Sequence, residues 1–385
     1  MTDFDLVHDR LGTGSSKWSK YPADVLPMWV ADMDFPAAPE IIEAITHRLK
    51  HPILGYGVAK DELRTAIVEN LETKYQWTVA PEEIVFLPGV EPGFNMAMKA
   101  FLEPGDGITV QTPVYRPILS APSHWGLMRR DAALTPGVFG WELELEPFKT
   151  ELGKSKAFLL CNPQNPTGKV FSREELTSMA DACREQNVLV ISDEIHCELL
   201  FDSRHHIPFA SLSDDAAQRT ITLMAASKTY NIAGLKTAFA IIKNRRMRET
   251  FSASRLGMVD SVNIIGLEAT LAAYTQAGEW KTAMLRYLES NRDFLSDEIN
   301  RRFPSINVIK AEGTFLAWLD CTALKLESDP QTYFLENGKV GFSAGSEFGP
   351  DYANFIRLNF ACPRAILVEG LDRIERALKA TNSRP

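Results

Sequence analysis

Short apolar runs bounded by turn residues recur along the first two thirds of the chain. They span residues 84–87, 108–110, 157–160, 188–191 and 220–224. Each run is apolar at consecutive positions, which is typical of strands buried on both faces, whereas a strand with one wet face alternates apolar and polar residues. The runs therefore predict the strands of one buried sheet.

Helical patterns separate these strands. Apolar residues recur every four positions over 61–75, as they do on one face of an amphipathic helix. A second helix begins at Ser172, whose hydroxyl can cap the helix while Glu175, three residues on, completes a capping box. Alternation of strands with helices predicts an α/β fold with a mostly parallel sheet.

The pattern changes beyond Gly266. Apolar positions from Trp280 to Ile299 predict one long amphipathic helix that ends near Pro304. Strand-like pieces and a final helix follow, at 308–309, 315–318, 340–342, 355–358 and 368–378. The C-terminal region is therefore predicted to be a smaller α+β unit.

Charge and cysteine content narrow the class of protein. The 385 residues carry 41 lysines and arginines against 50 aspartates and glutamates, a net charge of −9, which argues against a nucleic-acid partner. No apolar run approaches the ~18 residues that cross a membrane. The acidic N-terminus lacks the pattern of a signal peptide. Five cysteines without a C-x-x-C pair favour reduced thiols. We therefore expect a cytoplasmic protein with no membrane partner.

Two charged residues follow buried strands of the predicted sheet. Lys228 lies in "SKTYNIAGLK", and a buried lysine costs free energy unless it has a partner or a covalent task. Asp193 lies in "SDEIHCEL", at the sheet edge where open α/β folds place ligand contacts. Taken alone, Lys228 is equally compatible with a surface or ion-paired lysine, and Asp193 with a helix N-cap.

Two loops carry further candidates. "CNPQNPTG" places Asn162 and Asn165 in a tight loop after a strand, where they either shape the turn or contact a ligand. "FLPGVEPGF" is a strand, a glycine corner and a helix, so backbone N–H groups at 89–91 could hold a phosphate. No G-x-G-x-x-G or P-loop pattern is present, which disfavours dinucleotide and P-loop binding.

An aromatic and an arginine complete the candidates. Tyr115 in "QTPVYRP" either stacks on a planar ligand or packs in the core. Arg357 in "FIRLNFACPR" suits two-pronged capture of a carboxylate, and a structural ion pair explains it equally well. His205 and His206 are expected to face solvent. No metal site is expected, because the aspartates of "WVADMDFP" have no His or Cys nearby.

The order of these motifs resembles the fold-type I pyridoxal-phosphate enzymes of the class I/II aminotransferase superfamily. Within it, "LPMWVADMDF", "SDEIHCEL", "SKTYNIAGLK" and "IRLNFACPR" are similar to the cystathionine β-lyase branch, the MalY/PatB-type carbon–sulfur lyases. The resemblance spans nearly the whole chain. It implies pyridoxal 5'-phosphate as the cofactor.

The resemblance also implies a role for each matching residue. Lys228 resembles the lysine that forms an aldimine with the cofactor, and Asp193 the residue that keeps the pyridine nitrogen protonated. Tyr115 would stack on the ring and is the third residue of the implied catalytic set. Asn165 and His196 would lie near the ring hydroxyl.

Further residues are implied to hold the phosphate. Val90 and Glu91 would bind it through backbone amides, with Ser227 and Lys236 beside them. Tyr56 in "LGYG" resembles the tyrosine that reaches the phosphate of the neighbouring subunit, which implies a homodimer with shared active sites.

The implied substrate site contains Arg357, which would bind the α-carboxylate, together with Asn162 and Asp34. Two residues depart from the pattern of relatives. Glu91 puts an acid at the phosphate corner, so its side chain must point away or be neutralised. Ala225 stands where many relatives have a phosphate-binding serine, and we expect an altered cofactor affinity rather than its loss.

The implied fold is that of aspartate aminotransferase. A large domain at 45–280 would carry a mostly parallel sheet between helices and bind the cofactor. A small α+β domain would combine both chain ends, residues 1–44 and 281–385.

The implied activity is a β-lyase that cleaves L-cystathionine or S-substituted L-cysteines to a thiol, pyruvate and ammonia. Lys228 would take the Cα proton, after which the thiolate leaves from Cβ. An aminotransferase using the same residues is the first alternative. The second, of another class, is a regulatory protein that acts by contact with another protein.

Overall fold

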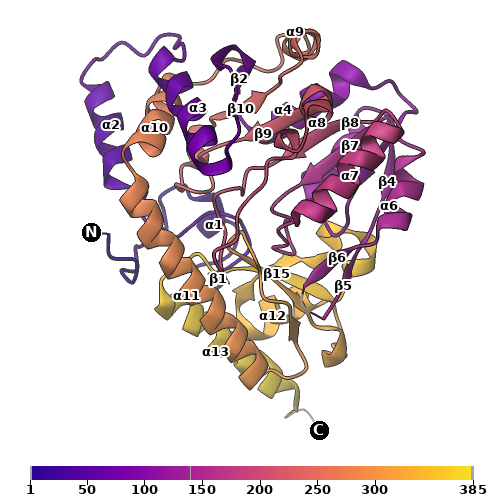
Figure 1. The fold of residues 1–385 in the computed structure, drawn as a ribbon. Coiled ribbons are helices and arrows are strands. Elements are labelled where there is room, and N and C mark those ends of the chain that lie inside the picture. Colours follow the sequence, from indigo (N-terminus) through magenta and orange to yellow (C-terminus); the bar gives the residue numbers. More distant parts are fainter. Residues whose placement is uncertain (1, 139, 383–385) are drawn as a thin grey trace.

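Seven strands form the central sheet in the computed structural model, which describes residues 2–138 and 140–382 (Figure 1). In spatial order they are β2 (Ile84–Leu87), β10 (Ala238–Ile241), β9 (Thr220–Met224), β8 (Leu189–Asp193), β7 (Ala157–Cys161), β3 (Gly107–Val110) and β4 (Met128–Asp131). Pairing is parallel from β9 to β4, and β10 runs antiparallel to both of its neighbours. All five predicted strand runs lie in this sheet, which confirms the mostly parallel sheet.

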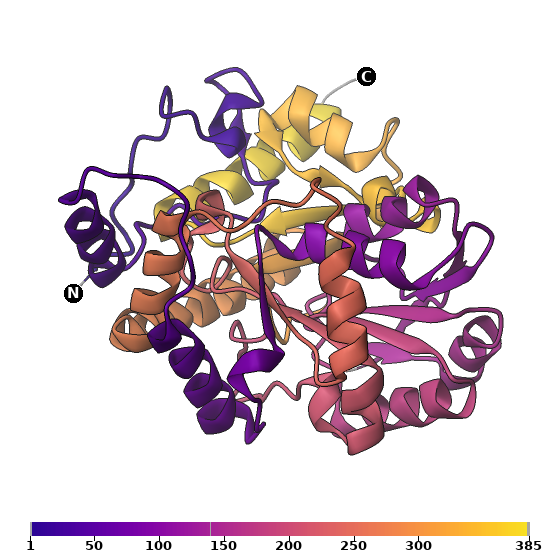
Figure 2. The same cartoon turned by 90° about the horizontal axis from the view of Figure 1, so that it is seen from above.

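The inner strands are mainly apolar because they lie between two hydrophobic cores, whereas the edge strand β4 is mostly polar. Along β7, Ala157, Leu159 and Cys161 join one core, while Phe158 and Leu160 join the other. The two sets of helices lie on opposite sides of the strands when the molecule is seen from above (Figure 2). The first core is covered by α4 (Val90–Phe101), α5 (Arg116–His124) and α9 (Arg245–Ala253), and the second by α6 (Leu145–Leu152), α7 (Arg173–Glu185) and α8 (Asp214–Arg219).

Several helices begin where the sequence predicts. At the start of α7, Ser172 Oγ accepts a hydrogen bond from Glu175 N at 3.2 Å, and Glu175 Oε2 accepts one from Ser172 N at 2.9 Å. These two bonds confirm the capping box. The predicted helix at 61–75 is α3 (Asp61–Tyr75), which covers the β2 edge of the sheet together with α10 (Ile264–Thr275). Next to α10 packs α2 (Pro39–Leu49).

A second, antiparallel sheet forms the smaller part of the molecule. Its strands, in spatial order, are β11 (Asn307–Val308), β12 (Leu316–Asp320), β15 (Phe355–Asn359) and β14 (Ser343–Ala344). The long predicted helix is α11 (Gly278–Arg302), and with α12 (Pro330–Gly338) and α13 (Arg364–Asn382) it covers this sheet. A short antiparallel pair, β5 (Leu134–Pro136) and β6 (Trp141–Leu143), lies apart from both sheets.

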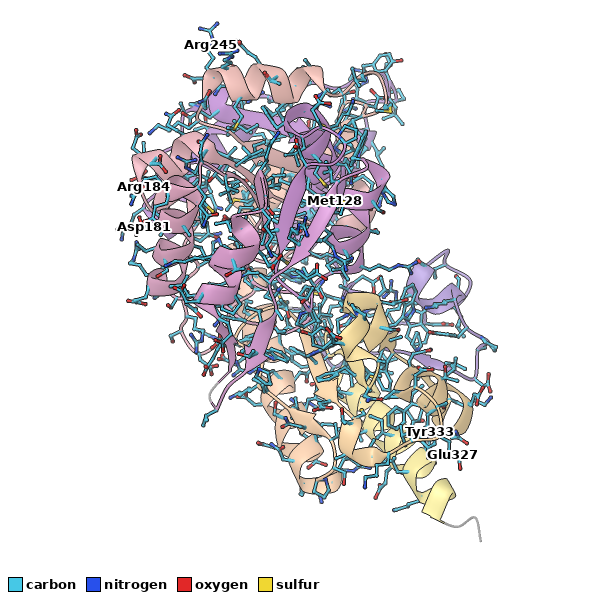
Figure 3. All side chains as sticks on the ribbon, turned by 90° about the vertical axis from the view of Figure 1, so that its right-hand side faces the viewer. Met128, Asp181, Arg184, Arg245, Glu327 and Tyr333 are labelled. Atoms are coloured by element: carbon cyan, nitrogen blue, oxygen red, sulfur yellow. The ribbon has the colours of Figure 1, made fainter. Side chains whose placement is uncertain are left out.

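Both ends of the chain meet in this smaller part. After α1 (Ser16–Ser19), strand β1 (Leu26–Pro27) pairs in parallel with β13 (Val340–Gly341). One hydrophobic core contains Phe4, Met28 and Phe35 from the N-terminal segment together with Leu288 and Phe342. Figure 3 shows this part as a lobe that carries Glu327 and Tyr333, below the lobe that carries Met128 and Arg245.

The division into two domains is not marked by a loop, and the core that the chain ends share also includes Leu199, Phe201 and Tyr230. The predicted boundaries at residues 45 and 280 fall inside α2 and α11, which continue across them. We therefore propose the same division, 45–280 against 1–44 with 281–385, on the ground that the segments at the two chain ends share one core. Among the described helices, none is both long and apolar enough to span a membrane.

Shortening a side chain in the core of the smaller part should destabilise the protein. Leu288 is fully buried on α11, and a leucine-to-alanine change at such a site costs about 2–5 kcal/mol because it leaves a cavity. Leu288→Ala should lower the urea midpoint of unfolding clearly, as followed by circular dichroism. Leu6→Ala, at a leucine that is 54% exposed, is the control and should change it little. Equal shifts for the two variants would contradict the placement of Leu288 in the core.

Candidate functional site

One cavity lies at the carboxyl ends of the central strands, as expected for an open α/β sheet. Its volume is about 630 Å³. Ten of the thirteen residues singled out from the sequence line it: Val90, Glu91, Tyr115, Asn165, Asp193, His196, Ser227, Lys228, Lys236 and Arg357. The structure thus brings together residues as distant in the chain as Val90 and Arg357, which are 267 positions apart.

Lys228 supplies an amine to this cavity. It follows β9, and its Nζ donates a hydrogen bond to Ala31 O at 2.7 Å. Burial, together with the positive charge of Arg357, lowers the pKa of this amine to about 8. A much larger share of Lys228 is therefore neutral and nucleophilic at neutral pH than of an ordinary lysine.

Asp193 places a carboxylate without a cation in the same cavity. It is the last residue of β8 and only 5% exposed, and its Oδ1 accepts a hydrogen bond from Ile195 N at 3.1 Å. No described residue forms an ion pair with it. Burial raises the pKa of Asp193 to about 7, against the usual value near 4. The carboxylate would be stabilised by a ligand that brings a positive charge or a proton to it.

His196 offers an unused ring nitrogen. The side chain is buried, and its ring lies edge-on to Phe315 at 5.9 Å between centroids. Its Nδ1 has no hydrogen-bond partner among the described residues. Burial holds the pKa of His196 well below its usual value, so the imidazole is neutral. A neutral imidazole can exchange a hydrogen bond with a ligand oxygen.

Arg357 is the buried cation of the cavity. From β15, its Nη1 donates to Asn165 Oδ1 at 2.8 Å, and its Nη2 donates to Trp29 O at 2.9 Å and to Ser343 Oγ at 3.2 Å. Burial lowers the pKa of Arg357 to about 10, which leaves it charged at neutral pH. Its Nε has no partner among the described residues. A buried guanidinium with a donor to spare suits a carboxylate ligand.

The glycine corner leads directly into α4. Gly89 is the N-cap and Val90 the first residue of this twelve-residue helix. The first N–H groups of a helix have no partner within it, so those of Val90 and Glu91 are available to an anion. Lys236 lines the same cavity and adds a positive charge. The Glu91 side chain is exposed. The burial of Tyr115, together with the negative charge of Glu91, raises the pKa of Tyr115 to about 12.

Three predicted residues do not line this cavity. Asn162 is 1% exposed, and its Oδ1 accepts a hydrogen bond from Phe171 N at 3.4 Å. Asp34 forms buried ion pairs with Lys17 at 2.6 Å and with Arg10 at 2.6 Å. Asn162 Nδ2 has no hydrogen-bond partner among the described residues, and the substrate contacts expected of Asn162 and Asp34 stay predictions.

Tyr56 is the third residue outside the cavity. It is 99% exposed, so within one chain it contacts neither the phosphate corner nor the amine. The resemblance in sequence implies that Tyr56 contacts the phosphate in the neighbouring subunit, and this contact stays a prediction.

The sequence missed a buried acid–histidine pair beside Asp193. Glu194 Oε2 lies 2.7 Å from His206 Nε2, and both side chains are fully buried. Glu194 Oε1 also accepts hydrogen bonds from Ser192 Oγ at 2.7 Å and from Phe209 N at 3.0 Å. The expectation that His206 faces solvent was wrong, although His205 is exposed. The polar loop around these histidines gave no signal of the burial.

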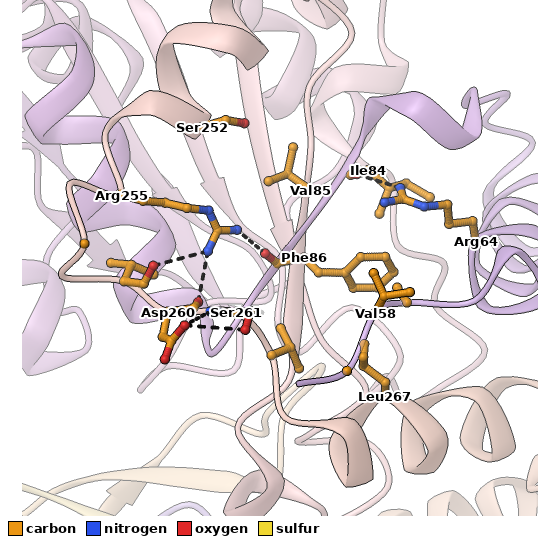
Figure 4. A pocket seen from close by; sticks show the side chains of 15 residues that line it. Val58, Arg64, Ile84, Val85, Phe86, Ser252, Arg255, Asp260, Ser261 and Leu267 are labelled. Atoms are coloured by element: carbon orange, nitrogen blue, oxygen red, sulfur yellow. Dashed lines mark hydrogen bonds between the residues drawn. The ribbon is translucent and has the colours of Figure 1, made fainter. Parts of the chain in front are cut away.

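A second cavity is lined by other residues (Figure 4). Its two arginines are already occupied by backbone oxygens, since Arg64 Nη1 donates to Ile84 O at 2.8 Å and Arg255 Nη2 donates to Phe86 O. These cations fix the ends of strand β2 and the loop after α9. Val58 at its rim is 83% exposed. The second cavity lacks the amine, carboxylate and imidazole of the first.

Comparisons with known proteins match this chain over nearly its full length. The family model described as aminotransferase class I and II matches residues 23–374. The cystathionine beta-lyase PatB of Bacillus subtilis (strain 168) is 39% identical over 393 aligned positions, which cover 98% of this chain and 100% of that protein.

Solved structures are similar to the same extent. Cystalysin from Treponema denticola, whose structure contains a pyridoxal 5'-phosphate cofactor, superposes with a TM-score of 0.95 at 30% identity and covers 99% of this chain and 100% of its own. A PLP-bound putative aminotransferase from Clostridium difficile 630 gives a TM-score of 0.95 at 36% identity, covering 98% and 100%. Both similarities confirm the predicted fold class.

The lowered pKa of Lys228 can be measured in cofactor-free protein. Lysines carrying ¹³C-methyl groups titrate by NMR, and most should have midpoints above pH 10. Two should titrate near pH 8, Lys228 and Lys74, the second because burial also lowers its pKa to about 8. Lys228→Ala should remove one of the two signals and Lys74→Ala the other. If the signal lost in Lys228→Ala titrates above pH 9.5, the proposed environment of the amine is wrong.

Proposed function

The chain belongs to the class I and II aminotransferase family, and from this membership we propose that it is a pyridoxal 5'-phosphate-dependent carbon–sulfur β-lyase. Its substrates would be L-cystathionine or other S-substituted L-cysteines. The observation that carries the proposal is the buried Asp193 carboxylate, which has no cation of its own and shares a cavity with the Lys228 amine. The lyase assignment is supported by the name of the PatB relative.

The unsatisfied groups of the cavity fit this cofactor one by one. Asp193 lacks a cation and would pair with the protonated pyridine nitrogen. His196 has a free ring nitrogen and would meet the ring hydroxyl. The N-terminus of α4, with Lys236 in the same wall, would bind the phosphate. Tyr115 lines the cavity and would pack on the ring.

Each residue then has a defined task in the reaction. Lys228 would hold the cofactor through Nζ, and as a free amine it takes the proton from the substrate Cα. Pyridoxal phosphate, when bound, supplies an electron-withdrawing ring that stabilises the negative charge left on Cα. Asp193 maintains the proton on the ring nitrogen, while Arg357 binds the α-carboxylate and orients the substrate.

Elimination completes the reaction when sulfur is bonded to Cβ. The Cα–H electrons form the Cα–Cβ double bond, the Cβ–S bond breaks, and its electron pair leaves with sulfur, which is protonated to a thiol. Water then replaces nitrogen, so one substrate and one water give one thiol, one pyruvate and one ammonium ion.

An aminotransferase would use the same first proton transfer. The similarity to the putative aminotransferase from Clostridium difficile favours this second candidate. Without a leaving group on Cβ, the same residues would support transfer of the amino group to a keto acid, with Lys228 moving the proton that it took from Cα. The two activities differ in product, because only elimination releases a thiol.

Incubation of the cofactor-saturated protein with L-cystathionine should release thiol and pyruvate in equal amounts. Lys228→Ala should lower this rate at least about a thousandfold, since it removes both the attachment point and the base. Lys243→Ala is the control, because Lys243 is an exposed lysine paired with Asp214. Thiol and pyruvate are followed by colorimetric and coupled assays. Amino transfer to a keto acid without thiol release would establish the aminotransferase instead.

We also propose that the protein works as a homodimer in the cytoplasm. Three large apolar side chains are exposed on the segment around Tyr56, namely Ile53, Leu54 and Val58. Two more, Leu256 and Met258, are exposed on the loop after α9. Val58 and Gly257 line one cavity, so the segment and the loop are neighbours (Figure 4). Contiguous exposed apolar surface is typical of a protein interface. A second copy seated here would bury Tyr56, which is otherwise 99% exposed.

Charge placed in this surface should separate the subunits. Val58→Asp should shift the mass measured by light scattering from dimer towards monomer and weaken binding of pyridoxal phosphate, as measured by equilibrium dialysis. Val138→Asp, at a valine that is 88% exposed on the β5–β6 turn, is the control and should remain dimeric. A wild-type protein that is monomeric at micromolar concentration would refute the dimer.

A further inference from the structure

Four charged residues in the wall of the active-site cavity have no task in the proposed reaction. They are Lys20, Glu91, Arg116 and Glu347. Arg116 and Glu347 offset each other, with Nη1 and Oε1 3.6 Å apart. Lys20 has no carboxylate partner among the described residues. Besides Arg357 and Lys236, which have tasks in the proposed reaction, the cavity therefore holds a further cation, Lys20, that is free to meet an anion.

Lys20 is held at the cavity by aromatic rings. It directly follows α1, and its Nζ lies 4.0 Å from the ring centroid of Trp29 and 5.1 Å from that of Tyr21. Contact of an ammonium with an indole face is attractive, and it restricts an otherwise flexible side chain. The residue is nevertheless exposed, so its charge is accessible to a ligand that enters.

Trp29, whose ring contacts Lys20, also contacts the buried Arg357 through its backbone. Trp29 O accepts hydrogen bonds from Arg357 Nη2 at 2.9 Å and from Ser343 Oγ at 3.0 Å. Trp29 Nε1 donates to Lys17 O at 3.1 Å. Trp29 is thus fixed at its backbone and at its ring. The buried Arg357 thus contacts the backbone of this anchored residue, and the exposed Lys20 contacts its ring.

Ion pairs fix the segment that carries Lys20. Lys17, three residues earlier, is 1% exposed and lies 2.6 Å from Asp34. Arg10 pairs with Asp34 at 2.6 Å and with Asp32 at 2.9 Å. A buried carboxylate with two cations holds its partners firmly, because loss of either one would leave a charge uncompensated. Lys20 is therefore part of the fixed wall of the cavity.

We propose that Lys20 is a specificity-determining residue that binds a carboxylate at the far end of the sulfur substituent. This inference rests on the proposed function, in which Arg357 takes the α-carboxylate at the reacting end. The preferred substrates are then S-substituted cysteines whose substituent ends in a carboxylate. An ammonium-to-carboxylate hydrogen bond is stronger than one to a neutral group. A substrate with a neutral substituent forms no ion pair with Lys20, which then stays hydrated and does not contribute to binding.

A ligand that cannot react tests this contact separately from catalysis. 3,3'-Thiodipropionate has a carboxylate at each end and no amino group, and its monoamide is neutral at one end. Calorimetry on the cofactor-saturated protein should show that the diacid binds about threefold to tenfold more tightly than the monoamide, as expected for one partly exposed ion pair. The difference should shrink at high salt.

Three variants assign this preference to Lys20. Lys20→Met keeps the side-chain length without the charge and should bring the two affinities together. Lys20→Arg keeps the charge and should retain the preference. Lys99→Met is the matched control, because Lys99 Nζ lies 5.9 Å over the Trp125 ring, outside the cavity, and should leave the preference unchanged. Equal binding of diacid and monoamide by the wild type, or a preference that survives in Lys20→Met, would overturn the proposal.

Turnover gives a second reading of the same contact. S-(2-carboxyethyl)-L-cysteine should have a KM about threefold to tenfold lower than S-(2-carbamoylethyl)-L-cysteine, in which the substituent ends in a neutral amide. The two kcat values should be similar, because the contact of Lys20 with the substituent is equal in the ground and transition states. Lys20→Met should remove the difference in KM. If neither compound is cleaved, the proposed lyase function fails, while the binding comparison still decides the role of Lys20.

Discussion

The fold depends on one constraint, the burial of a carboxylate at the end of a strand that is apolar on both faces. Asp193 ends β8 between β7 and β9, where its side chain is only 5% exposed. A charge in this position is costly unless something compensates it. The neighbouring strands deliver only neutral groups and the Lys228 amine, whose pKa is itself lowered by burial. The protein therefore gains most from a ligand that carries its own positive charge.

The same burial makes the cavity groups depend on one another. Arg357 lowers the pKa of Lys228, and Lys228 in turn opposes the rise in the pKa of Asp193. His196 is kept neutral by burial, and the two nearby cations add to this effect. Three ionisable groups and one imidazole thus act as a single electrostatic unit, in which a ligand that changes one charge changes the others.

The sequence predicted the parts that depend on local pattern. Continuous apolar runs indicated the parallel strands, and Lys228 and Asp193 were found because they lie at or shortly after the ends of such runs. Strand β10 was missed, because four apolar residues after a loop do not distinguish a strand from buried coil. The contacts of Asp34 and His206 were not indicated by the sequence, for another reason. Their partners Lys17 and Glu194 are 17 and 12 positions away, and spacing alone does not show which way a side chain turns.

The pairing of the two chain ends has a consequence for biogenesis. The cavity wall around Trp29 is held by Arg357 and Ser343, and Met28 O accepts a hydrogen bond from Asn359 N. These contacts join positions more than 300 residues apart, so they form only after most of the chain has left the ribosome. A nascent chain already carries Lys228 and Asp193 but lacks the part of the wall that Ser343, Phe348 and Arg357 supply. Tight capture of a cofactor is therefore a late event, and it marks chains that have been completed.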